Sequence, residues 1–121
     1  MDLRGRGLTN VELPDGFQQS AFVLVTLTNP REKLWGRLLG LDGRGAFVCG
    51  ILLDSFEDFV GELREGHPAV PLIAFFPMHR VERIEVDRSD GPLPSLVERF
   101  HDKTGTDASA IFRLEGEGAE S

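Results

Sequence analysis

The sequence predicts a small, strongly bent β-barrel of five strands, and two segments carry this prediction. The first, residues 34–42, has the pattern of a strand interrupted by Gly36 and Gly40 and ends in an Asp-Gly turn. Glycine inside a strand is typical of a strong bend or of close backbone approach. The second, residues 75–86, has the pattern of two strands separated by one tight corner at Pro77. Together they favour a closing sheet over a flat one.

Five runs rich in β-branched and aromatic residues are the predicted strands. The first run stops at the turn signal Asn29-Pro30, and residues 42–45 form the hairpin loop that joins the second run to the third. In the fifth run, the period-2 alternation places Ile84 inward and Asp87 outward. The predicted strands are residues 21–28, 33–42, 46–53, 70–76 and 81–87.

A helix is predicted between the third and fourth strands, where the hydrophobic period changes. Apolar residues of the segment 55–65 fall at positions i, i+3, i+4 and i+7, the stripe of an amphipathic helix. Ser55 and Asp58 have the spacing of a capping box. Gly61 lowers the helix propensity by about 1 kcal/mol relative to alanine.

A second short helix is predicted over residues 95–104. Ser95 and Glu98 form a capping box at its start, and Gly105 ends it. The acidic, glycine-rich end of the chain predicts disorder. The expected organisation is a loose lead-in over residues 1–17, a barrel with added helices over 18–105, and a flexible acidic tail over 106–121.

Composition is that of one soluble globular domain. The chain has 121 residues, 40% of them hydrophobic and 27% charged, with a net charge of −7. A negative balance argues against charge-driven binding of nucleic acid. Because the amino terminus lacks an apolar run, and because Cys49 is the one cysteine and cannot form an internal disulfide, we expect a cytoplasmic protein without a membrane partner.

The glycine-and-aspartate pattern at residues 36–42, with a two-sided third strand and a tight corner before the fifth, resembles the Sm-like (LSm) family. The resemblance covers residues 20–87, with residues 54–69 as an expanded variable loop. It implies a five-stranded, SH3-like barrel that assembles into rings through the fourth and fifth strands of neighbouring subunits. It also implies binding of single-stranded RNA, often uridine-rich, at the inner rim of the ring.

The sequence departs from the family at the RNA-binding motifs. Asp42 matches, but Arg44 stands at the position of the stacking aromatic or histidine, and Ala46 at that of the asparagine. The corner carries Pro77-Met78 in place of an Arg-Gly pair. A uridine pocket of the usual design is therefore not expected, although an arginine can stack on a base through its guanidinium plane. The ligand residues that the resemblance implies are Asp42, Arg44, Met78, His79 and Arg80.

Each of these residues also has a structural alternative. Asp42 can shape its own turn through a side-chain to backbone hydrogen bond. His79 and Arg80 can be solvated turn residues or subunit contacts. The positive charge around the rim can be a solvated face.

No catalytic or metal site is predicted. The sequence has no nucleophile motif and no glycine-rich phosphate loop. His67 and His101 have no Cys or His neighbour at metal-ligand spacing. We therefore expect a protein that is not an enzyme and that has no cofactor.

Two functional hypotheses remain. The first is a self-associating scaffold or binding module, a homo-oligomer held partly by strand edges, because the run from Ile73 to Phe76 has few guarding charges. The alternative is a single-stranded RNA-binding protein with a modified base pocket. The acidic balance and the altered motifs favour the first hypothesis. Its expected interface residues are Ile73, Phe75, Phe76 and Ile84.

Overall fold

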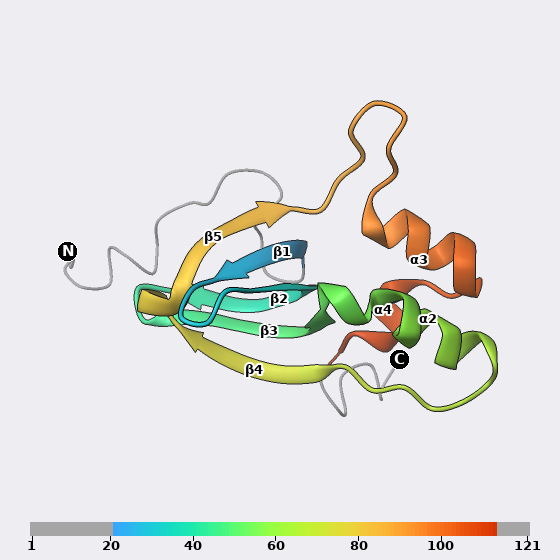
Figure 1. Cartoon of the computed structure of the whole chain (residues 1–121), viewed down its shortest axis with the longest axis horizontal. Helices are drawn as coiled ribbons and strands as arrows, with labels where there is room; N and C mark the ends of the chain where they lie inside the picture. The colour runs from blue at the N-terminus through green and yellow to red at the C-terminus, as the bar shows by residue number, and fades with distance from the viewer. Residues whose placement is uncertain (1–20, 114–121) are drawn as a thin grey trace, which may run out of the picture.

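A computed structural model describes residues 21–113, which form one antiparallel sheet with helices gathered at one end (Figure 1). The sheet has five strands in the order β4-β3-β2-β1-β5. The sheet, the helix between the third and fourth strands and the C-terminal helix confirm the sequence prediction. The elements are β1 (Phe22–Leu27), β2 (Glu32–Asp42), β3 (Gly45–Leu52), the 3-10 helix η1 (Leu53–Ser55), α2 (Phe56–Arg64), β4 (Leu72–Pro77), the 3-10 helix η2 (Met78–Arg80), β5 (Val81–Val86), α3 (Leu96–Thr104) and α4 (Ala108–Ile111).

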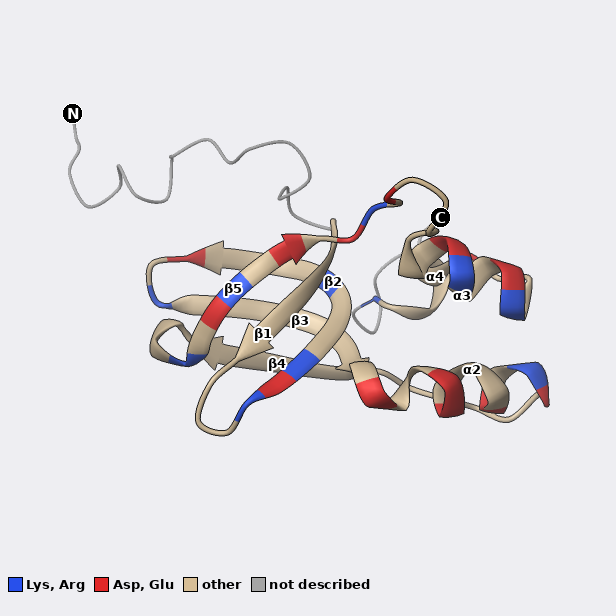
Figure 2. Ribbon diagram, turned by 45° about the horizontal axis from the view of Figure 1, so that its top comes forward, with Lys and Arg blue, Asp and Glu red and all other residues tan. Residues whose placement is uncertain are grey.

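The longest strand, β2, curves through the sheet (Figure 2). Gly36 of β2 lies directly opposite Gly50 of β3, so neither position carries a side chain where the two backbones approach. A Cβ on Gly36 would come within 2.4 Å of the Cys49 carbonyl oxygen. The register between β2 and β3 then shifts between Leu38 and Gly40. Such a bulge adds twist and bends the strand, so these two features account for the curvature.

The two edge strands β4 and β5 are joined at one corner by the three residues of η2. Backbone hydrogen bonds tie this corner to two other turns. The Met78 N–H donates to the Arg44 carbonyl at 2.8 Å, and the Thr28 N–H donates to the Arg80 carbonyl at 2.8 Å. Within residues 21–113, β4 and β5 do not pair with each other, so both remain sheet edges.

One core lies on the face of the sheet that none of the helices within residues 21–113 covers. It is made only of strand residues, and its buried members are at most 1% exposed. Phe76 of β4 and Ile84 of β5 both pack against it from the two edges. The two edge strands of the curved sheet thus both contribute side chains to this core. The members are Val23, Val25, Leu27, Leu34, Leu38, Ala46 and Val48.

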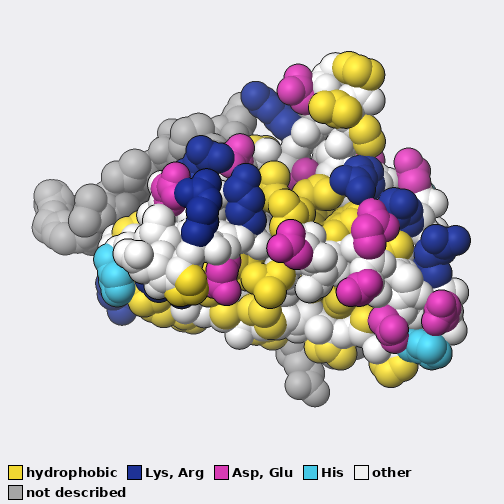
Figure 3. Space-filling model, in the orientation of Figure 1, with side chains coloured by type: hydrophobic (Ala, Val, Ile, Leu, Met, Phe, Trp, Pro, Cys, Tyr) yellow, Lys and Arg dark blue, Asp and Glu magenta, His cyan; other side chains and the backbone are white. Residues whose placement is uncertain are grey.

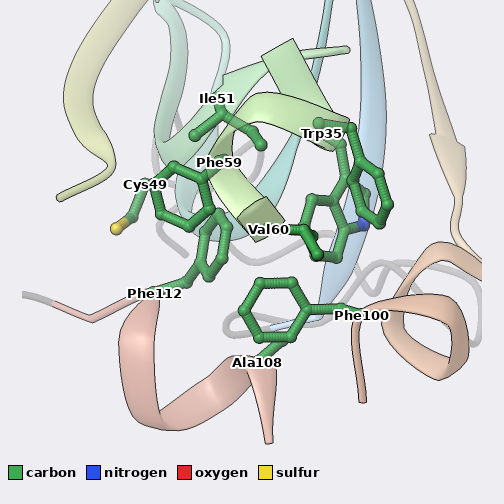
Figure 4. Close-up of a cluster of buried hydrophobic side chains, with 9 residues drawn as sticks. Trp35, Cys49, Ile51, Phe59, Val60, Phe100, Ala108 and Phe112 are labelled. Atoms are coloured by element: carbon green, nitrogen blue, oxygen red, sulfur yellow. The ribbon is translucent and has the colours of Figure 1, made fainter. Parts of the chain in front are cut away.

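A second core lies between the other face of the sheet and the helices. It is aromatic: the Trp35 ring lies 4.9 Å from Phe112 and 5.8 Å from Phe100, centroid to centroid. Figure 4 shows these side chains converging from the sheet and from the helices. Its buried members are Trp35, Cys49, Ile51, Phe56, Phe59, Val60, Phe100, Ala108 and Phe112.

The helix starts differ from each other. Ser95 accepts a hydrogen bond from the Glu98 N–H, and the Glu98 carboxylate accepts from the Ser95 N–H, so the predicted capping box is confirmed. The box predicted at Ser55 and Asp58 is wrong, because the Ser55 side chain makes no cap hydrogen bond. Ser55 instead ends η1 and continues directly into α2, which leaves it outside the extended conformation of a capping residue.

The predicted tail begins at residue 106, but residues after this position belong to the second core, between the sheet and the helices. Asp107 caps α4, and Ala108 and Phe112 are fully buried. The Arg37 guanidinium donates to the Phe112 carbonyl at 2.9 Å, which fixes the end of α4 on β2. The predicted lead-in and the remainder of the predicted tail lie outside the described residues. Among the described helices, none has the length and apolarity needed to cross a membrane.

Candidate functional site

Three turns meet at the corner end of the sheet, and this rim holds the predicted ligand residues. Gly45 pairs with Pro77 across β3 and β4, which places the β2–β3 turn beside η2. The hydrogen bond from Met78 to the Arg44 carbonyl closes this contact. The structure thus brings the backbones of the two predicted ligand segments together. We call the group Asp42, Arg44, Met78, His79 and Arg80 the rim residues.

Asp42 and Arg44 bind each other. The Asp42 Oδ1 accepts a hydrogen bond from the Arg44 backbone N–H at 2.8 Å, and its Oδ2 accepts from the Arg44 guanidinium at 3.0 Å. The side-chain hydrogen bond, followed by the backbone one, holds the pKa of Asp42 below its usual value, and the same pair raises the pKa of Arg44. Asp42 thus has the turn-shaping role, while the Arg44 side chain is still 85% exposed.

Arg80 points to a different neighbour. Its Nε–H donates to the Thr28 carbonyl at 2.8 Å, and its terminal nitrogen donates to the Pro30 carbonyl at 2.9 Å. The same nitrogen lies 3.5 Å from the Glu32 carboxylate. The guanidinium therefore joins the η2 corner to the β1–β2 turn. Met78 and His79 beside it are exposed.

The predicted interface residues lie on the two edge strands, β4 and β5, and divide into two groups. Phe76 of β4 and Ile84 of β5 are half-buried against the strand-only core. Ile73 and Phe75 are instead 50% and 42% exposed, and the Phe75 ring lies 4.8 Å from the exposed Phe47 ring of β3. Figure 3 shows hydrophobic side chains along the lower edge of its view, where β4 lies in Figure 1. Strand β4 carries no charged residue.

The sequence analysis missed Phe47 as a surface residue. Its strand is apolar on both faces, a pattern that fits a closed barrel or a sheet covered on both sides and that does not single out Phe47. The cross-strand register pairs Phe47 with Phe75 on the edge strand, outside the area that the helices cover.

The described residues hold no group of metal-ligating side chains. Open hollows lie near the helices. One, of about 390 Å³, is lined by Leu24, Phe56 and Leu96 with others, and Arg99 lies over Phe56 at its side, 5.0 Å from the ring centroid. Arg99 is also paired with Glu57 at 3.2 Å. This charged pair links α3 to α2, so the hollow lies at the contact between these two helices.

Comparison with protein-family models, with curated proteins and with solved structures found no match for this chain.

Proposed function

We propose that this chain is a self-associating, Sm-like barrel that acts as a scaffold or binding module and has no catalytic activity. One observation carries the proposal. The edge strand β4 is uncharged and presents exposed apolar side chains, and no strand within residues 21–113 pairs with its outer row of backbone groups. Monomeric proteins usually guard such an edge with charges, proline or a covering segment, because it can pair with another chain.

The barrel part of the proposal is supported by the position of the two edges. In a flat five-stranded sheet the outer strands would lie about 19 Å apart, at about 4.8 Å per spacing. Here three residues join Pro77, the end of β4, to Val81, the start of β5, and the four Cα–Cα steps between those two residues span at most about 14 Å. The strand-only core, with residues from both edges against it, supports the same curvature.

The two edges also support head-to-tail association. A contact between β4 of one copy and β5 of the next leaves one β4 and one β5 open at the ends of the assembly. Such a heterologous contact gives a ring when the rotation between copies closes, and a filament when it does not. The number of copies is set by that rotation.

The mass of the protein in solution tests the proposal. Multi-angle light scattering and sedimentation velocity over a range of micromolar concentrations should show an oligomer. Phe75→Lys should lower the oligomeric state, because it places a charge in the pairing edge. Leu52→Lys is the matched control: Leu52 is as exposed as Phe75 but lies at the end of β3, beyond its last pair with β4. It should leave the assembly unchanged.

Circular dichroism of both variants separates lost assembly from lost folding. A folded Phe75→Lys monomer beside an oligomeric Leu52→Lys protein is the expected pair of results. A wild-type protein that is a monomer at every concentration would refute the scaffold proposal. So would a folded Phe75→Lys protein with the wild-type mass.

A second candidate, single-stranded RNA binding, is favoured by the exposed guanidinium of Arg44 at the rim. Three features weigh against it: the net charge of −7, the Asp42 carboxylate on that guanidinium, and the commitment of Arg80 to the β1–β2 turn. Fluorescence anisotropy with oligouridine at several salt concentrations tests it, because phosphate contacts give a steep slope of log affinity against log salt.

A further inference from the structure

The connection from β5 to α3 forms a small hairpin that projects from the body of the protein (Figure 1). Asp90 and Leu93 exchange both backbone hydrogen bonds, at 2.8 and 3.0 Å. Gly91 supplies the left-handed conformation that the turn requires, with φ of 61°. Leu93 is 65% exposed between two prolines. The hairpin therefore presents one apolar side chain on a stiff support.

The segment that leads into β4 presents a second apolar side chain. Val70 is 84% exposed, the largest value among the exposed large apolar residues of the described chain, and Leu72 just after it is also exposed. Pro68 and Pro71 flank Val70 and restrict its backbone. Leu93 has the second largest exposure of the same group. Each copy thus carries two prominent apolar side chains that its own fold does not cover.

The topology relates these two side chains across a contact between copies. Strand β4 enters the η2 corner and β5 leaves it, so both the start of β4 and the end of β5 lie away from that corner (Figure 1). An antiparallel pair of β5 from one copy and β4 from the next places Val86 of the first beside Leu72 of the second. The hairpin after Val86 then meets the segment before Leu72.

We infer that the hairpin of residues 88–94 docks on residues 68–72 of the neighbouring copy, with Leu93 packed against Val70. This inference rests on the proposed self-association and extends its interface beyond the two strands. Opposite charges adjoin the two segments in the sequence: Arg88 begins the hairpin and has no ion-pair partner among residues 21–113, and Glu65, three residues before Pro68, is 69% exposed, with His67 3.7 Å from its carboxylate. The occupant of the Val70 surface is thus a second copy of this chain.

Disulfide trapping tests the contact directly. In a Cys49→Ala background, Val70→Cys and Leu93→Cys proteins are prepared separately, one with a mass tag, and then mixed under mild oxidation. The expected product is a disulfide-linked dimer that contains one tagged and one untagged chain. Either protein alone should give much less dimer, because head-to-tail contact does not bring two copies of the same position together. Met78→Cys in place of Val70→Cys is the control for random collision, because Met78 is also exposed but lies past the opposite end of β4.

Leu93→Ser provides the energetic test, and its exposure means that the fold should be unaffected. Loss of one partly buried leucine contact should weaken self-association by about tenfold, with Leu52→Ser unchanged. Two results would overturn this inference and leave the scaffold proposal standing, provided that the wild-type protein is an oligomer. One is a yield of mixed disulfide no higher than in the random-collision control. The other is a Leu93→Ser variant that self-associates with wild-type affinity. A monomeric wild-type protein would overturn both.

Discussion

The indole Nε1–H of Trp35 donates a hydrogen bond to Oδ2 of Asp87 at 3.1 Å, which joins the middle of β2 to the residue after β5. The same carboxylate accepts hydrogen bonds from the N–H groups of Leu96 and Val97, at 2.8 and 3.0 Å. These two donors lie in the first turn of α3, where N–H groups have no partner within the helix and where negative charge is favourable. One carboxylate thus fixes α3 on the aromatic core.

Replacing Asp87 with alanine should destabilise the fold by about 2–4 kcal/mol, because three donors lose a charged acceptor in a partly buried place. Urea unfolding followed by the fluorescence of Trp35, the one tryptophan of the chain, measures this change. Asp102→Ala is the control, since Asp102 is exposed on the same helix, and a change within about 0.5 kcal/mol is expected there. Equal unfolding midpoints for the two variants would contradict the role given to Asp87.

Asp87 also shows what the sequence pattern can and cannot predict. Alternation placed Ile84 and Asp87 on opposite faces, and Ile84 does pack against the strand-only core. Asp87 lies just past the end of β5, where the chain leaves the sheet, and its partners come from distant elements. The capping box at Ser95 was predictable because both partners lie within one helical turn. No local sequence pattern predicts that the Asp87 carboxylate accepts hydrogen bonds both from the Trp35 indole and from the first turn of α3.

Phe112 shows the same limit of local sequence patterns at the end of the domain, because it is buried although the sequence predicts a flexible tail there. The acidic, glycine-rich composition of the last residues extended the predicted tail back to residue 106. A local signal against this was present: Asp107 followed by Ala108, Ile111 and Phe112 has the form of a capped apolar turn. The rim residues likewise include both local contacts, which the sequence can predict, and distant contacts, which it cannot. The Asp42 turn closes locally, whereas the acceptors of Arg80 lie about 50 positions earlier in the chain.

The two glycines of β2 should differ in their tolerance of alanine. At Gly36 a Cβ would lie 2.5 Å from the Gly50 Cα and closer still to the Cys49 carbonyl, so Gly36→Ala must push β2 and β3 apart. At Gly40 a Cβ meets only the Phe47 side chain, at 3.8 Å. We expect Gly36→Ala to cost about 1–3 kcal/mol, in the range of overpacked sites, and Gly40→Ala to change stability little. Thermal unfolding of both variants measures the difference, and equal melting temperatures would refute it.

The Asp42 carboxyl should titrate at a lower pH in the native protein than in the Arg44→Ala variant. Its pKa lies below the ordinary 3.8 because Arg44 donates hydrogen bonds to the charged form. Since the native state binds this proton less readily than the unfolded state, the pair stabilises the turn above that ordinary value and loses its effect as the pH falls through the native pKa. A carbon-detected NMR titration of the side chain measures this. An unchanged Asp42 pKa in Arg44→Ala would show that the pair does not form in solution.

The last prediction separates the two rim arginines. Arg80→Ala should destabilise the fold by about 1–3 kcal/mol, because it removes a donor from the partly buried Thr28 carbonyl contact and a second donor from the exposed Pro30 carbonyl contact. Arg44→Ala should leave stability nearly unchanged, since its exposed ion pair is weak.

Under the scaffold proposal, wild-type protein binds oligouridine no better than an acidic control protein. Under the RNA alternative, Arg44→Ala flattens the salt slope by about one unit for each subunit contacted. Oligouridine binding that persists at physiological salt and depends on Arg44 would favour the RNA alternative over the scaffold. Urea unfolding and anisotropy on the same preparations therefore assign one arginine to the fold and test the other as a ligand contact.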